Sequence, residues 1–105
     1  MILERDIERR LVRNVEAAGG LCVKFIPDNR AGMPDRLVLL PGGVVAWCET
    51  KKPKGGELSA VQLYRHKELR ALGQRVYVVW TAEDADAIVA ALVALGACTR
   101  AHPPA

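Results

Sequence analysis

The sequence predicts a single α/β domain in which a mixed β-sheet packs against helices. Segments with helical spacing of apolar residues alternate with short runs of β-forming residues, in the order α-β-β-β-α-β-α. Glycine or proline follows most of these segments and separates them. The chain has 105 residues, 50% of them hydrophobic, so it has room for one core and not for two.

The first helix and the first strand follow each other directly. Apolar residues recur at helical spacing from Leu3 to Ala18, and two glycines then stop the helix. Residues 21–26, LCVKFI, are rich in β-forming residues and end at Pro27. Turn-forming residues over 28–34 then predict a loop.

The next two strands form a predicted hairpin, with RLVLL at 36–40 and VVAWCE at 44–49. A three-residue loop has Pro41 in the favoured position of a type I turn and Gly43 in a left-handed conformation. Such a loop pairs Leu40 with Val44. We expect the second of these strands to be central and covered on both faces, because both of its faces begin apolar.

This register decides which residues meet at the far end of the hairpin. Counting back from the turn pairs Asp35 with Glu49. A two-residue turn would instead pair Asp35 with Thr50 and send the two acids to opposite faces. The three-residue loop therefore predicts that the Asp35 and Glu49 carboxylates lie opposite each other on the same face of the sheet.

The second half of the chain continues as helix, strand and helix. Ser59 and Gln62 have the spacing of a capping box at the start of a helix that ends near Leu72, before a glycine. Residues 75–80, RVYVVW, predict a strand.

The last helix is predicted to start at Thr81 and Asp84, which can cap it, and to run through Leu95, with Gly96 as its stop. Residues 99–105 are expected to form a flexible tail, which leaves 1–98 as the folded domain.

The acids and one lysine are the candidate functional residues. Glu49 and Lys51 project from the same face of their strand, and directly opposed strand residues have Cβ atoms about 4.5–5.5 Å apart. Asp35 and Glu49 could therefore share one hard cation such as Mg²⁺. In the first helix, Glu4 falls near the middle of the apolar stripe and Glu8 near its edge, so either could be a third acid.

This combination of acids and a lysine suits hydrolysis of a phosphodiester bond. A divalent cation can polarise the phosphate and acidify a water, while the Lys51 ammonium orients that water or stabilises developing charge. The alternative is that Glu49 and Lys51 have no catalytic role and form a local ion pair at a solvent-exposed strand end.

The motifs together resemble those of a known family. GMPD at Gly32–Asp35, ETK at Glu49–Lys51 and LSAVQ at Leu58–Gln62, with E-x-x-I in the first helix, are similar to the VRR-NUC branch of the PD-(D/E)XK nuclease superfamily. The match is to its small stand-alone form, found in phages and bacteria, and extends from about Glu4 to Trp80.

The resemblance implies a restriction-endonuclease-like core and a homodimer that cleaves branched DNA, four-way junctions above all, with Mg²⁺ or Mn²⁺. It implies Asp35, Glu49, Lys51 and Gln62 as catalytic residues. The metal ligands would be Asp35, Glu49, the carbonyl of Thr50 and a helix acid, Glu4 or Glu8. Gln62 also has a purely structural interpretation, because it completes the capping box.

Basic residues around the motif are candidates for contacts to DNA. Lys52 and Lys54 flank Lys51, and Arg30 and Arg65 are further candidates. The net charge of +3 permits a polyanionic partner but does not require one. We expect His66 to have a surface role, since no ligand partner is near it in the sequence.

The sequence also bears on location and on rival functions. Three cysteines without C-x-x-C spacing, a charged N-terminus and the lack of a long apolar run predict a cytoplasmic protein with no membrane association. The resemblance implies that the cell is a bacterium or a phage-infected host. Two alternatives remain: a flap- or nick-type nuclease subunit, and a DNA-binding module of a larger complex that does not cleave.

Overall fold

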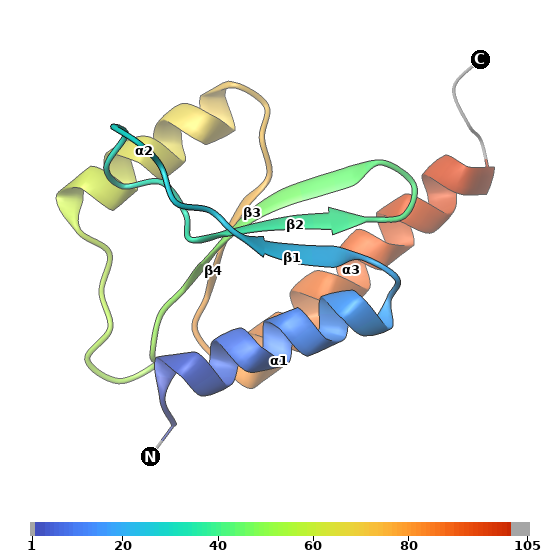
Figure 1. The fold of residues 1–105 in the computed structure, drawn as a ribbon, viewed down its shortest axis with the longest axis horizontal. Helices are drawn as coiled ribbons and strands as arrows, with labels where there is room; N and C mark the ends of the chain where they lie inside the picture. The colour runs from blue at the N-terminus through green and yellow to red at the C-terminus, as the bar shows by residue number, and fades with distance from the viewer. Residues whose placement is uncertain (1, 102–105) are drawn as a thin grey trace.

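A computed structural model describes residues 2–101 and has the predicted order of elements (Figure 1). The chain forms three helices and one four-stranded sheet, so the α/β class is confirmed. The elements are α1 (Glu4–Ala17), β1 (Leu21–Lys24), β2 (Arg36–Leu40), β3 (Val44–Thr50), α2 (Ala60–Ala71), β4 (Val76–Val79) and α3 (Ala82–Ala101).

The sheet is mixed, with the strand order β1-β2-β3-β4. The first three strands are antiparallel, and β4 joins β3 in parallel. Leu40 pairs with Val44 and Arg36 with Cys48, which confirms the three-residue loop and its register. The type I turn was wrong in detail: Gly42 has φ +90° and Gly43 has φ +75°, as in a type II turn followed by a left-handed residue.

The core lies between one face of the sheet and the helices α1 and α3. Alternate residues of β2 and β3, such as Val38 and Ala46, are fully buried there against Leu11 and Leu92 of the two helices. An apolar stripe along α1, formed by Ile7, Leu11 and Val15, makes this contact, as its helical spacing predicts.

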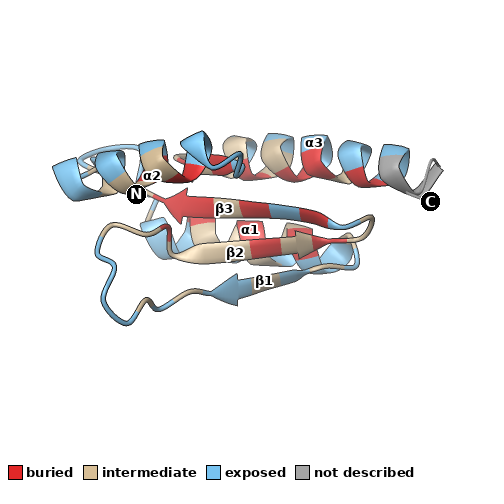
Figure 2. Cartoon of the chain, turned by 90° about the horizontal axis from the view of Figure 1, so that it is seen from above, coloured by how far each residue is buried: buried red, intermediate tan, exposed pale blue. Residues whose placement is uncertain are grey.

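The opposite face of β1, β2 and β3 is open. Figure 2 looks onto it, and no helix lies in front of these three strands. Val45 of β3 is 36% exposed, and Leu21 and Val23 of β1 are 60% and 44% exposed. The expectation that β3 is covered on both faces was therefore wrong: α2 packs near β4 and leaves the rest of this face uncovered.

Two predicted boundaries differ from the structure by two residues or more, and the strand predicted at 75–80 is shorter by one residue at each end. β1 ends at Lys24 instead of residue 26. α3 does not stop at Gly96 but continues to Ala101. The glycine serves a close approach instead of a helix stop: a Cβ there would lie 2.2 Å from the Pro41 carbonyl oxygen. The first residues of the predicted flexible tail are thus helical, and residues 102–105 of that tail lie outside the described residues.

None of the helices formed by residues 2–101 is long and apolar enough to cross a membrane. The three cysteines, Cys22, Cys48 and Cys98, are free thiols.

Candidate active site

The two strand acids come together at the open end of the β2–β3 hairpin. The last pair of the ladder is Arg36 with Cys48, so the next position along it sets Asp35 opposite Glu49. The backbone N–H of Phe25 donates to the Asp35 carbonyl at 2.9 Å, which continues the pairing of the β1 side to this point. The sequence-based prediction of facing acids is therefore confirmed in register.

The loop before Asp35 is fixed against α2. Gly32 has φ +85°, and a Cβ on it would lie 2.5 Å from the Val61 carbonyl oxygen, so only glycine fits this approach. The Arg65 guanidinium donates to the Ala31 carbonyl at 3.1 Å. Pro34 is fully buried. Together these contacts hold the loop so that Asp35 enters the sheet at a defined position.

Both carboxylates are poorly solvated, and each has one oxygen without a partner, although a backbone hydrogen bond from Thr50 to the Asp35 carboxylate opposes the rise in its pKa. Glu49 is 4% exposed, and neither Asp35 Oδ1 nor Glu49 Oε1 has a hydrogen-bond partner among the described residues. Burial and the neighbouring acids, above all Glu8, raise the pKa of Asp35 to about 6. Burial and the Asp35 carboxylate raise the pKa of Glu49 to about 7, against an opposing effect of Lys51. Buried carboxylate oxygens without protein donors are available to bind a cation.

Lys51 lies beside these acids, just after β3. Its backbone N–H donates to the Val79 carbonyl of β4 at 3.0 Å, which fixes the main chain there. Within residues 2–101 its ammonium forms no ion pair, yet it acts electrostatically on both Glu49 and His66. The amine is thus available for a ligand.

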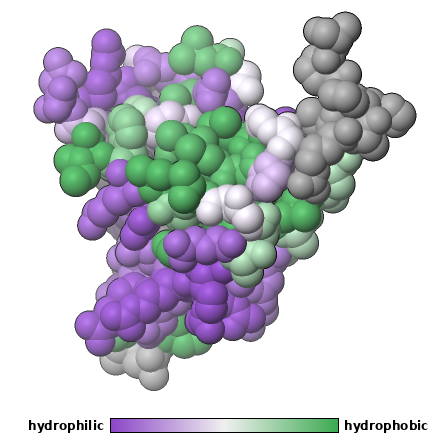
Figure 3. Space-filling model, turned by 45° about the vertical axis from the view of Figure 1, so that its right-hand side comes forward, coloured by the Kyte–Doolittle hydropathy of each residue, from purple (hydrophilic) through white to green (hydrophobic). Residues whose placement is uncertain are grey.

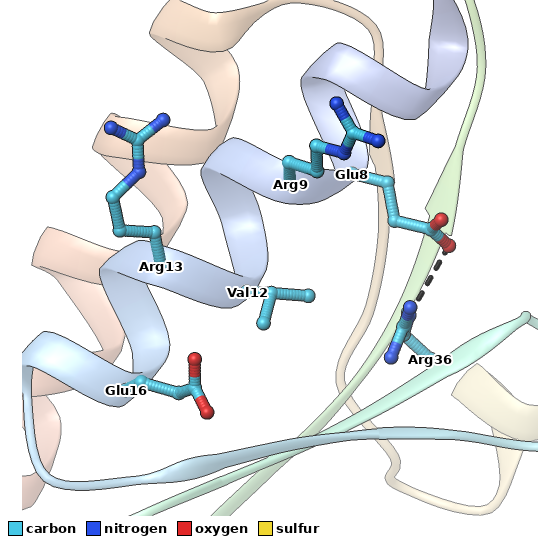
Figure 4. A pocket seen from close by; sticks show the side chains of 6 residues that line it. All are labelled: Glu8, Arg9, Val12, Arg13, Glu16 and Arg36. Carbon is cyan, nitrogen blue, oxygen red and sulfur yellow. Dashed lines mark hydrogen bonds and ion pairs between the residues drawn. The ribbon is translucent and has the colours of Figure 1, made fainter.

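The helix acids differ in their surroundings. Glu8 forms an ion pair with Arg36, with 3.2 Å between Oε2 and Nε (Figure 4). The pair borders a hollow of about 280 Å³ beside α1, which is also lined by Arg9, Val12, Arg13 and Glu16. Glu4 is exposed, not buried in the apolar stripe, and among the described residues it has no ion pair. Its charge raises the pKa values of both Asp35 and Glu49.

α2 contributes two polar side chains on this side of the sheet. Gln62 Oε1 accepts from the Ser59 N–H at 2.9 Å, and Ser59 Oγ accepts from the Gln62 N–H, so the predicted capping box is confirmed. His66 is 1% exposed, and its Nε2 lies 3.7 Å from Glu49 Oε1. Burial, Arg70 and Lys51 lower the pKa of His66, which disfavours the charged imidazolium and therefore an ion pair at this contact.

The expected surface role of His66 was therefore wrong. His66 follows Gln62 by four residues and precedes Leu69, a buried residue, by three. This helical phase placed it on the packed side of α2, and that signal was available in the sequence.

The basic candidates are spread around the site. Lys52 and Lys54 are exposed and border a hollow of about 500 Å³ with Ile2, Leu3 and Pro53. Arg30 is exposed on the loop before Asp35. Arg65 is half-buried and already pairs with Glu68 at 2.6 Å as well as with Ala31. Contacts from these four residues to DNA remain predictions.

No three histidine, cysteine or acidic side chains within residues 2–101 stand close enough together to enclose a metal ion on their own. A cation here would depend on two acids supplemented by backbone carbonyl, water or phosphate oxygens, which is a coordination typical of Mg²⁺.

Comparisons with known proteins agree with this picture. No model of a protein family matches the chain. The curated protein "Putative nuclease p44" of Acyrthosiphon pisum secondary endosymbiont phage 1 is 40% identical over 92 residues, which cover 88% of this chain and 97% of that protein. A solved structure described as a VRR_NUC domain aligns with a TM-score of 0.77 and 34% identity, covering 82% of this chain and 92% of the other.

Proposed function

The chain belongs to the VRR-NUC family of the PD-(D/E)XK nuclease superfamily, and from this we propose that it is a Mg²⁺- or Mn²⁺-dependent DNA endonuclease that acts as a homodimer on four-way junctions. The observation that carries the proposal is the pair of buried, unpartnered carboxylate oxygens on Asp35 and Glu49, with the Lys51 amine beside them.

The residues present fit a divalent cation. Asp35, Glu49 and the Thr50 carbonyl would hold it, and water or phosphate oxygens would complete its coordination. Of the two helix acids, Glu4 would act on the ion from further away, because the Glu8 carboxylate is already balanced by Arg36. Such an ion supplies charge stabilisation at the scissile phosphate and lowers the pKa of a bound water.

The remaining chemistry belongs to side chains of this protein. Lys51 would donate to a phosphate oxygen or hold the attacking water, since its ammonium has no competing carboxylate within hydrogen-bond reach among the described residues. Gln62 would contact the substrate with its amide nitrogen, because its oxygen is engaged by Ser59.

The electrostatics around the site support a DNA substrate. Lys52 and Lys54 extend the cationic region away from Lys51 along one loop, where the phosphate backbone would follow them. Arg30 and Arg65 would contact a second segment of the branched DNA from the loop before Asp35.

The open face of the sheet supports a homodimer. Up to the acid pair at its end, the side chains of this face on β1, β2 and β3 are apolar: Leu21, Val23, Leu37, Leu39, Val45 and Trp47. Figure 3 shows an apolar band at the height of the sheet, between hydrophilic side chains above and below it. Uncovered apolar areas of this kind mark protein interfaces, and a two-fold axis gives the two sites that cut two strands.

The test uses labelled four-way junction, flap and linear duplex substrates, each with Mg²⁺ or with chelator. We expect paired cuts in the junction that require the metal, and a fall in rate of about 100-fold or more for Lys51→Ala. Lys67→Ala, which removes an exposed lysine on α2, serves as the matched control.

Each other result points to a different function. Cleavage of the flap alone supports a flap- or nick-type nuclease subunit. Tight binding of the junction without cleavage supports a DNA-binding module. Cleavage that survives Lys51→Ala or Asp35→Ala contradicts the assignment of the site.

A further inference from the structure

A buried histidine of α2 has no structural partner. His66 is 1% exposed, and neither Nδ1 nor Nε2 forms a hydrogen bond with any described residue. Its closest polar neighbour is Glu49, whose Oε1 lies 3.7 Å from Nε2 and is itself unpartnered. Two buried polar groups thus face each other just beyond hydrogen-bond distance.

Packing does not explain why a histidine occupies this position. A buried polar atom without a partner costs about 1–3 kcal/mol, so an apolar side chain of similar size would give a more stable helix contact. Leu69, one turn further along α2, is such a residue and is buried. The polar group at position 66 therefore needs a functional reason.

We propose that His66 is a positioning residue of the active site: its imidazole N–H holds Glu49 Oε1 and so orients this carboxylate for the divalent cation. This inference rests on the proposed function. In either protonation state the imidazole carries at least one N–H, so a donor is always present. A shift of roughly 0.5–1 Å brings the two atoms within hydrogen-bond distance.

The proposed contact matters because the fold leaves Glu49 otherwise unheld. Among the described residues, no donor binds its Oε1. Partners that orient ligating carboxylates typically contribute 10- to 100-fold in metal affinity or activity. His66 would supply this orientation from α2, an element that carries neither of the paired acids.

The test compares His66→Leu, which keeps an apolar side chain in the space, with His66→Gln, whose amide nitrogen can replace Nε2 as a donor. Lys67→Gln is the matched control on the exposed side of the same helix. Thermal unfolding is followed in chelator and over a Mn²⁺ titration, which gives the metal midpoint without DNA. Junction cleavage is then measured at saturating metal.

We expect His66→Leu to keep or raise the melting temperature in chelator while its Mn²⁺ midpoint rises 10- to 100-fold. His66→Gln should bring the Mn²⁺ midpoint most of the way back to the wild-type value, and Lys67→Gln should have the wild-type midpoint. A His66→Leu protein with a lower melting temperature in chelator and an unchanged midpoint would overturn the proposal, since this is the behaviour of a purely structural residue.

The experiment distinguishes a failure of the proposed metal-dependent function from a failure of the role proposed for His66. If Mn²⁺ does not shift the melting temperature of the wild type, the metal-dependent function itself fails. If Mn²⁺ shifts the wild type and Glu49→Gln abolishes the shift, but His66→Leu binds like the wild type, only the role of His66 is overturned.

Discussion

The two facing carboxylates, Asp35 and Glu49, are buried in a way that destabilises the fold when they are charged. Their pKa values lie at about 6 for Asp35 and about 7 for Glu49, because burial and nearby acids, Glu8 for Asp35 and Asp35 for Glu49, disfavour ionisation. A cation between them would remove both penalties. Stability of the metal-free protein and activity should therefore respond in opposite directions to the same substitution.

Replacement of one acid tests this opposition. Asp35→Asn removes a half-buried negative charge next to Glu49, so we expect the free energy of unfolding in chelator at pH 7.5 to rise by about 1–3 kcal/mol. Cleavage of a junction should be lost. Denaturation in urea with chelator measures the first effect, and a variant that is both inactive and less stable would contradict the argument.

The raised pKa values also predict how stability depends on pH. In the metal-free fold these acids keep their protons to about pH 6 and 7, whereas in the unfolded chain they lose them near pH 4. The folded state therefore binds more protons over this range, and the free energy of unfolding falls as pH rises. The lowered pKa of His66 acts in the opposite direction, but only below its ordinary value of 6.5.

Chemical denaturation in chelator between pH 6.5 and 8 isolates the contribution of Glu49. We expect stability to decrease over this interval in the wild type and to stay flat in Glu49→Gln. Saturating Mg²⁺ should remove the decrease, because the bound cation favours the ionised carboxylate. Stability that rises with pH in the metal-free wild type would show that the acid is not buried as described.

At the scale of the elements, features set by neighbouring residues could be predicted from the sequence. The hairpin register followed from the Pro41-Gly42-Gly43 loop, and both halves of the α2 capping box follow from Ser59 and Gln62. Features set by distant contacts could not be predicted. The uncovered face of β3 depends on where α2 packs, which no local pattern encodes.

Gly96 is the clearest case of a distant contact. Locally it resembles a helix stop, yet α3 continues past it, and the glycine is required because its backbone lies against the Pro41 carbonyl of the β2–β3 turn. Gly42 faces Gly96 in return, and a Cβ on Gly42 would lie 2.4 Å from the Gly96 carbonyl oxygen. The pair of glycines thus fixes the distance between α3 and the hairpin.

A substitution separates the two explanations of Gly96. Helix propensity alone predicts that Gly96→Ala stabilises the protein by about 1 kcal/mol. We expect a loss of roughly 1–3 kcal/mol instead, because the added Cβ forces the turn away from the helix. Ala94→Gly, at an exposed position of the same helix, reports the propensity effect alone. A Gly96→Ala protein that gains stability in urea denaturation would refute the contact.

The whole molecule has two different surfaces at the sheet. The site acids and Lys51 lie at one end, where Lys52 and Lys54 add positive charge. The apolar face of β1, β2 and β3 begins next to the acids and carries no charge that could bind phosphate. DNA would therefore occupy the charged end and leave the apolar face for a protein partner.

The last prediction concerns this apolar face as the contact between two copies of the chain. Val23→Lys puts an ammonium onto this face at its edge strand β1, and burying that charge without a partner is costly, so the homodimer should dissociate. We expect light scattering to give the mass of one chain, and junction cleavage to change from paired cuts to single nicks. Leu72→Lys is the matched control, since Leu72 is 72% exposed at the far end of α2 and should leave the dimer intact. A wild type that is monomeric at all concentrations would contradict the dimer, whereas a Val23→Lys protein that stays dimeric would place the contact on another surface.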